Sequence, residues 1–121
     1  MYTKIFTTLP QEAKNIRIEV FMKEQGFENE FDDIDTISHH IVVFDEGKPI
    51  GTCRFFKENN HYTIGRVAVL KEYRNQHIGN LLLESAENEI KKLNGDLIVV
   101  HAQVRVSPFY EKQGYIQFGQ I

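Results

Sequence analysis

The sequence predicts a mixed α/β (α+β) fold in which a central, mostly antiparallel sheet is flanked by helices. Three stretches with strand-like alternation, residues 38–44, 50–56 and 61–70, follow one another with only turn residues between them, which indicates an antiparallel meander. A helical pattern over residues 76–93 then precedes a short apolar stretch at 97–101. Because a strand, a helix and a strand in succession default to a right-handed parallel crossover, this last stretch is predicted to pair in parallel with the strand before the helix.

The residues before the meander predict one strand and one helix. Residues 2–7 alternate as a strand does, and Thr8 is the expected N-cap of a helix that extends to about Glu24. Gly26 stands where a glycine commonly follows a helix, and Arg17 is expected on the solvated side of this helix. Its core face is expected to consist of Ile16, Val20 and Phe21.

The long helix and the C-terminal segment are the remaining predicted elements. Asn94 and Gly95 are expected to end the long helix, and Ser107 is expected to cap a short helix over residues 108–112, ahead of a strand at 115–118. The buried stripe of the long helix is expected to contain Ile78, Leu81, Leu82, Ala86 and Ile90.

Length and composition favour a single domain over residues 1–121 and argue against several classes of protein. A chain of 121 residues can bury roughly two thirds of its unfolded surface in one core. A formal net charge of −3 without a block of like charges argues against nucleic-acid binding through a broad cationic face. No apolar run is long enough for a signal segment or a membrane span, so a cytoplasmic protein is expected. The single cysteine, Cys53, is interpreted as a small core residue rather than a nucleophile.

A polar loop joins the third strand of the meander to the long helix, and this order of elements can create an anion site. The first N–H groups of a helix lack intrahelical partners and carry the positive end of the helix dipole. Gly79 has no Cβ and lets the backbone approach a ligand closely, while Arg74 can add a charged, planar donor suited to phosphate. The residues alone therefore predict an anion-binding strand, loop and helix.

The same loop resembles the diphosphate-binding signature of the GNAT acetyltransferases. That signature has Gln or Arg, two residues, Gly, one residue, and Gly or Ala; residues 74–79 read Arg-Asn-Gln-His-Ile-Gly, with His77 in place of the first glycine. The Val-Ala-Val run at 67–69 and the Phe-Tyr-Glu-Lys-Gln-Gly-Tyr run at 109–115 resemble two further segments of the family. Segments across nearly the whole chain are similar to the YjcF/ElaA-like branch of GNAT proteins.

The resemblance implies the GNAT acyl-CoA N-acyltransferase fold, with acetyl-CoA as co-substrate. The main chain of Val67, Ala68 and Val69 would bind the pantetheine arm as a neighbouring strand would. Gln103 resembles a residue that also bonds pantetheine, and an exposed amide at a strand end is the structural alternative. The residues that would hold the diphosphate are Arg74, Asn75, Gln76, His77, Ile78, Gly79 and Asn80.

Tyr110 is the candidate general acid and would also contact the cofactor. Its position matches the tyrosine that in many relatives protonates the departing CoA thiolate, and a phenol of pKa about 10 can donate that proton. A core tyrosine with a solvated hydroxyl is the structural alternative. The general base is open between Glu24, His101 and, through water, the acidic loop, because Thr63 stands near the strand position where some relatives carry a glutamate.

Polar residues outside the cofactor segments fall into two further groups. The acidic loop at 27–36 is either a solvated connection or the rim of a pocket for a cationic amine. Arg66 lies in an apolar strand and is expected to form a structural ion pair with a carboxylate of this loop. His39 and His40 would point to opposite faces of a strand, so no metal site is predicted.

The predicted reaction is direct transfer of an acetyl group from acetyl-CoA to the primary amine of a small molecule. The branch is related to the glucosamine-6-phosphate N-acetyltransferases, which implies an amino sugar phosphate as one acceptor; Arg54, Arg66 or Arg105 could supply its basic pocket. A non-catalytic acyl-CoA sensor is the alternative function. A dinucleotide-binding module is less favoured, because the loop has one glycine and follows hairpins rather than alternating strands and helices.

The chain ends at Ile121, before the seventh strand that the family normally adds. The final strand is therefore expected to be missing, to be supplied by a second chain as in a homodimer, or to lie in residues that follow Ile121. An exposed sheet edge beside residues 115–118 favours aggregation, so this edge is expected to be covered.

Overall fold

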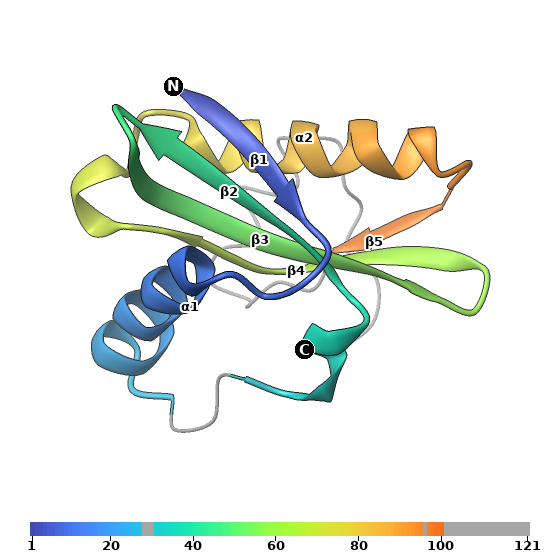
Figure 1. Ribbon diagram of the computed structural model, residues 1–121, viewed down its shortest axis with the longest axis horizontal. Helices are drawn as coiled ribbons and strands as arrows, with labels where there is room; N and C mark the ends of the chain where they lie inside the picture. Colours follow the sequence, from blue (N-terminus) through green and yellow to red (C-terminus); the bar gives the residue numbers. More distant parts are fainter. Residues whose placement is uncertain (28–30, 96, 101–121) are drawn as a thin grey trace.

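The computed structural model describes residues 1–27, 31–95 and 97–100, which form a twisted sheet with helices on both faces (Figure 1). The strands are β1 (Tyr2–Phe6), β2 (His39–Asp45), β3 (Lys48–Glu58), β4 (His61–Val69) and β5 (Ile98–Val100). The helices are α1 (Gln11–Arg17), the π-helix η1 (Ile18–Glu24), the 3-10 helices η2 (Asp33–Thr36) and η3 (Lys71–Tyr73), and α2 (Ile78–Lys92).

The strands lie in the order β1-β2-β3-β4-β5, and this topology confirms the predicted mixed sheet. β1 to β4 pair antiparallel, and β5 pairs in parallel with β4 up to Ile64 opposite Val100. The β2–β3 turn places Glu46 at φ +50° and Gly47 at φ +83°. Two successive left-handed residues form the tight turn whose twist matches that of a hairpin, so this turn sets the β2–β3 pairing.

Alternate residues of the strands supply two hydrophobic layers, one under α2 and one under α1 and η1. Figure 1 shows α2 running along one side of the sheet and α1 lying on the other. The layer on the α2 face comprises Ile41, Val43, Ile50, Cys53, Phe55, Ile64, Ile78, Leu82, Leu83, Ala86 and Ile90. The layer on the α1 face comprises Ala13, Ile16, Val20, Phe21, Val42, Phe44 and Ala68. The centre of the sheet is therefore buried from both sides.

The first helix differs from its prediction in its start and in its winding. It begins at Gln11 with Pro10 at the N-cap, so the expected cap at Thr8 is wrong. Proline suits this position because the missing N–H would have no helical partner there. After α1 the chain continues as the π-helix η1, a rare winding that is frequently found at functional sites. Gly26 follows at φ +81°, as its predicted place after the helix requires.

The long helix α2 is confirmed, and Gly51 of β3 determines how closely it approaches the sheet. All predicted stripe residues are buried except Leu81, which is half-buried, and Leu83 joins them. A Cβ on Gly51 would lie 2.9 Å from Cγ2 of Ile78 and 3.3 Å from Cδ1 of Leu82. The missing side chain thus lets the N-terminal turn of α2 rest against β3.

Cys53 is 1% exposed, which confirms its predicted place in the core. Burial raises the pKa of its thiol to about 12, so the thiol stays protonated at neutral pH and does not act as a nucleophile.

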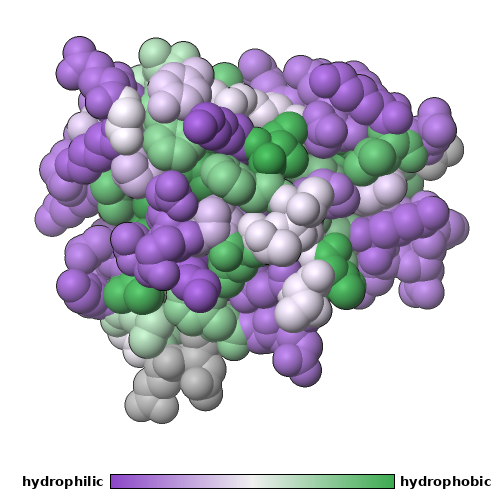
Figure 2. All heavy atoms as spheres, in the orientation of Figure 1, coloured by the Kyte–Doolittle hydropathy of each residue, from purple (hydrophilic) through white to green (hydrophobic). Residues whose placement is uncertain are grey.

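Figure 2 shows hydrophobic side chains interspersed with hydrophilic ones on this face of the molecule. No helix among residues 1–27, 31–95 and 97–100 has the length and apolar character that crossing a membrane requires. The predicted helix at 108–112 and strand at 115–118 lie outside the described residues.

Candidate active site

A bulge in β4 interrupts its regular pairing with β3 next to the predicted cofactor strand. The β3–β4 register shifts at this point, and Arg66 adopts φ +52°. An extra residue in one strand changes which edge the following backbone groups face. Beyond the bulge, Leu70 donates its N–H to the carbonyl of Ile50 in β3 at 2.9 Å. By alternation, the backbone groups of Val67 and Val69 face the opposite edge of β4.

This end of β4 also lies beyond its pairing with β5. Within the described residues, the parallel ladder is seen up to Ile64 opposite Val100, and β4 continues to Val69. Among the described strands, β3 alone pairs with the part of β4 that follows Ile64. An edge that carries N–H and C=O groups can bind an extended ligand as it would bind another strand.

The loop after β4 leads to an N-terminus of α2 that has no side-chain cap. The first helical hydrogen bond runs from the N–H of Leu81 to the carbonyl of His77 at 3.2 Å, so the N–H groups of residues 78–80 precede the helical ladder. The first turn contains no acidic residue, so no carboxylate of this turn offsets the positive end of the helix dipole. This end of the helix is therefore suited to binding an anion.

His77 occupies the first glycine position of the signature and adopts the left-handed backbone that a glycine adopts readily. Its φ is +62°, and Asn75 two residues earlier has φ +67°. A left-handed conformation costs a residue with a Cβ about 1–2 kcal/mol, and Asn and His are among the residues found there most often. Nδ1 of His77 lies 3.4 Å from Nδ2 of Asn80, which places the imidazole beside the first turn of α2.

Arg74, the predicted diphosphate ligand, is bound by Glu24, a predicted general base. The Nη1 and Nη2 atoms of Arg74 each lie 2.7 Å from a carboxylate oxygen of Glu24. The Nε–H of Arg74 donates to the carbonyl of Val69 at 3.0 Å. The hydrogen bonds to Glu24 raise the pKa of Arg74. Two predicted site residues that are far apart in the sequence thus meet at the end of β4.

Residues 7–121 match the family model of the acetyltransferase (GNAT) domain. The chain belongs to the GNAT acetyltransferase family. It is therefore a GNAT N-acetyltransferase, a member of a family that uses acyl-CoA as co-substrate. YjcF of Bacillus subtilis (strain 168), described as an uncharacterized N-acetyltransferase, is 34% identical to it over 107 residues, which cover 87% of this chain and 76% of YjcF.

Solved structures show the same GNAT fold. An acyl-CoA N-acyltransferase from Pseudomonas aeruginosa has a TM-score of 0.85 at 21% identity, with 98% of this chain and 89% of that chain covered. ElaA of Escherichia coli has a TM-score of 0.81 at 22% identity, with 96% and 88% covered. The identity to YjcF confirms the predicted branch of the GNAT family, and ElaA shares its fold.

On the α1 face of this GNAT sheet, Asp35 is the centre of a buried ion-pair cluster. Arg17 donates to both of its carboxylate oxygens at 2.8 Å and 3.1 Å, and Arg54 donates at 2.9 Å. Burial alone would raise the pKa of Asp35, but hydrogen bonds from Arg17 and Arg54 outweigh it and hold the pKa at about 2. Arg17 is 1% exposed, so its predicted place on the solvated side of the helix is wrong.

Asp32 extends this cluster from η2 to β4. Nη1 of Arg54 lies 2.7 Å from Oδ1 of Asp32, and Nη2 of Arg66 lies 3.3 Å from its Oδ2. The hydrogen bond from Arg54 lowers the pKa of Asp32. The predicted ion pair between Arg66 and the acidic loop is confirmed. Asp32 and Asp35 bind arginines, so this part of the loop is not a simple solvated connection. That the loop forms the rim of a pocket for a cationic amine stays a prediction.

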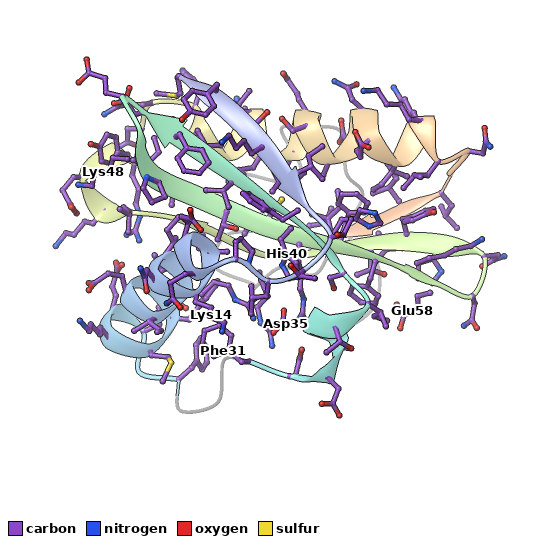
Figure 3. The ribbon with its side chains drawn as sticks, in the orientation of Figure 1. Lys14, Phe31, Asp35, His40, Lys48 and Glu58 are labelled. Atoms are coloured by element: carbon purple, nitrogen blue, oxygen red, sulfur yellow. The ribbon has the colours of Figure 1, made fainter. Side chains whose placement is uncertain are left out.

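His39 and His40 lie on opposite faces of β2, as predicted. Nε2 of His40 lies 3.0 Å from the carbonyl oxygen of Asp35, so Nε2 carries the proton and donates it (Figure 3). Burial lowers the pKa of His40. His39 stacks on Phe55 of the α2 face with ring centroids 4.8 Å apart. Within the described ranges, no group of three or more His, Cys, Asp or Glu side chains could hold a metal ion.

Sequence reasoning missed Glu58, a carboxylate beside the strand position where a base was sought. Oε1 of Glu58 accepts a hydrogen bond from Oγ1 of Thr63 at 2.9 Å and lies 3.4 Å from Nε2 of His61. Glu58 stands opposite His61 across the β3–β4 hairpin and shares the α1 face with Arg54 by the two-residue period. The hairpin register was the signal that could have revealed it. The predicted residues His101, Gln103, Arg105 and Tyr110 lie outside the described residues.

Proposed function

We propose that the protein transfers an acetyl group from acetyl-CoA directly to the primary amine of a small molecule. One observation carries this proposal: the edge of β4 at Val67 and Val69 faces away from β3, pairs with no other strand among the described residues, and leads through one short loop to the N-terminus of α2, where the His77 side chain forms no cap. In a GNAT chain, this places an extended edge for pantetheine beside an anion site for the diphosphate. Val67 to Val69 would bind the pantetheine arm, and residues 74–80 would bind the diphosphate.

The proposed chemistry is attack of the amine nitrogen on the thioester carbonyl while both substrates are bound. A C–N bond forms and the C–S bond breaks, and the negative charge that builds on the carbonyl oxygen is stabilised by the backbone N–H of Val67. Tyr110 gives its proton to the departing thiolate. The amine proton passes to a base, for which Glu24, His101 and Glu58 are the candidates.

The finer proposal for the acceptor is an amino sugar phosphate such as glucosamine 6-phosphate. Arg66 supports it, because the β4 bulge places this half-exposed guanidinium on the α1 face, next to Val67 in sequence. Arg54 is a weaker candidate for the phosphate, because Asp32 and Asp35 bind it and it is 4% exposed. Arg105 lies outside the described residues.

An acceptor screen tests this function against the alternative of a non-catalytic acyl-CoA sensor. Release of CoA thiol is measured with acetyl-CoA and a panel of primary amines that includes glucosamine and glucosamine 6-phosphate. An enzyme releases CoA and forms acetylated amine in equal amounts, and the finer proposal expects the phosphorylated sugar to react faster. Binding of acetyl-CoA without turnover on any amine supports the sensor and contradicts the transferase.

A further inference from the structure

We propose that Glu24 and the cofactor diphosphate compete for Arg74, so that cofactor binding replaces the Glu24 carboxylate and frees it. This inference rests on the proposed function, because it requires acyl-CoA to bind at the loop before α2. It makes Glu24 a residue that controls cofactor affinity.

The contacts of Arg74 divide its guanidinium into a fixed part and an exchangeable part. Its Nε–H is bound to the carbonyl of Val69 at the end of β4, 3.0 Å away. Both Nη atoms point at Glu24, each 2.7 Å from one oxygen. A diphosphate offers the same paired acceptor oxygens as a carboxylate and carries more negative charge. A diphosphate can therefore take the place of the Glu24 carboxylate at the two Nη atoms while Nε keeps its bond to Val69.

The position of Arg74 brings the diphosphate within reach. Arg74 directly follows η3, in the loop between β4 and the start of α2. Whatever anion binds the N–H groups of residues 78–80 therefore lies a few residues along the chain from this guanidinium. While Arg74 is paired with Glu24, the Glu24 carboxylate reduces the positive charge that the loop can offer to an anion.

The degree of burial makes this pair exchangeable, in contrast to the cluster on the α1 face. The side chains of Arg74 and Glu24 are each 37% exposed, whereas those of Arg17 and Asp35 are 1% and 6% exposed. Solvent screens an exposed pair strongly, so separating one costs little, while separating a buried pair leaves charges without water. Arg74 can therefore change partners at small cost, and Arg17 cannot.

The winding of η1 supports a special role for Glu24. This residue ends a π-helix in which Gln25 donates its N–H to the carbonyl of Val20, five residues back, at 3.1 Å. The wider π turn rotates the residues that follow it relative to an α-helix of the same length. The π turn therefore helps to orient the Glu24 side chain toward Arg74 in the loop.

Calorimetric titration of CoA into the wild type and four variants tests the competition. Glu24→Gln keeps the shape of the side chain and removes its charge, and it is expected to tighten CoA binding about fivefold. Glu72→Gln is the matched control, because Glu72 acts on Arg74 only through charge at a distance; it is expected to change the affinity less than about twofold. In an Arg74→Gln background, Glu24→Gln is expected to have no further effect.

Pantetheine, which lacks the diphosphate, provides the second readout by NMR titration. Its affinity is expected to be the same in the wild type and in Glu24→Gln. CoA binding that weakens or stays constant in Glu24→Gln overturns the competition, and so does an equal gain in Glu72→Gln or a gain that persists without Arg74. A wild type that binds no CoA at all overturns the proposed function as well, which separates the two failures.

Discussion

Replacing Asp35 with Asn is expected to destabilise the fold by about 3–5 kcal/mol, because it removes one partner of a buried ion pair. The variant keeps the side-chain shape but leaves Arg17, which is 1% exposed, without the carboxylate that accepts hydrogen bonds from its Nη1 and Nη2. Arg54 keeps its contact with Asp32, so the larger loss is at Arg17. Urea denaturation measures the difference as a change in the free energy of unfolding.

Asp33→Asn is the matched control for this substitution. Asp33 is an exposed neighbour on the same 3-10 helix, and surface changes of this kind alter stability by about 0.5 kcal/mol or less. If both variants unfold at the same urea concentration, the proposed contribution of the Asp35 ion pairs to the free energy of unfolding is wrong.

Acid titration gives an independent readout of Asp35. Its pKa falls from 3.8 to about 2 on folding, so the folded state favours the ionised carboxylate and gains stability above the unfolded pKa. That gain is present above pH of about 4 and is lost as the pH falls toward about 2. The wild type should lose this part of its stability in that window, and Asp35→Asn should lack it. Asp32 and His40 contribute their own acid dependence to both proteins.

Tyr110→Phe is expected to lower kcat about 100-fold or more, because the thiolate would leave without a proton donor. The ring keeps its size, so the affinity for CoA should stay nearly the same. Initial rates of CoA release, measured with the best acceptor from the amine screen, give kcat. Calorimetric titration gives the affinity for CoA.

Tyr115→Phe is the control for the loss of a tyrosine hydroxyl in the same segment of sequence. It is expected to keep kcat within a few-fold of the wild type, as an ordinary surface or packing change would. Equal kcat for the wild type and Tyr110→Phe removes Tyr110 from the mechanism.

The sheet and the long helix could be predicted because their signals are local. The turn at Glu46 and Gly47 separates two alternating stretches, and the stripe from Ile78 to Ile90 has the helical period. The parallel pairing of β5 followed from the handedness of crossovers and was confirmed. The start of the first helix was wrong because Thr8 and Pro10 both carry N-terminal signals, and the proline lies where the helix begins.

The partners of the charged residues could not be read from the sequence, because they depend on contacts between distant segments. Arg17 has the position of a solvated helix residue, yet Asp35 from another segment draws it into the core. Arg74 has the place of a phosphate ligand, and nothing local indicates that Glu24, fifty residues earlier, binds it. Arg66 was the exception, because a charge within an apolar strand requires a partner and the acidic loop offers several carboxylates.

The central claim is that the start of α2 and the edge of β4 that faces away from β3 bind acyl-CoA, and Asn80→Asp tests it most directly. A carboxylate in the first turn stabilises a free helix N-terminus and repels a bound diphosphate. Calorimetric titration of acetyl-CoA should give clear binding to the wild type and binding about tenfold weaker to Asn80→Asp, with an equal or higher melting temperature. A well-folded wild type that gives no heat with acetyl-CoA, or a variant that binds it as tightly as the wild type, would contradict the claim.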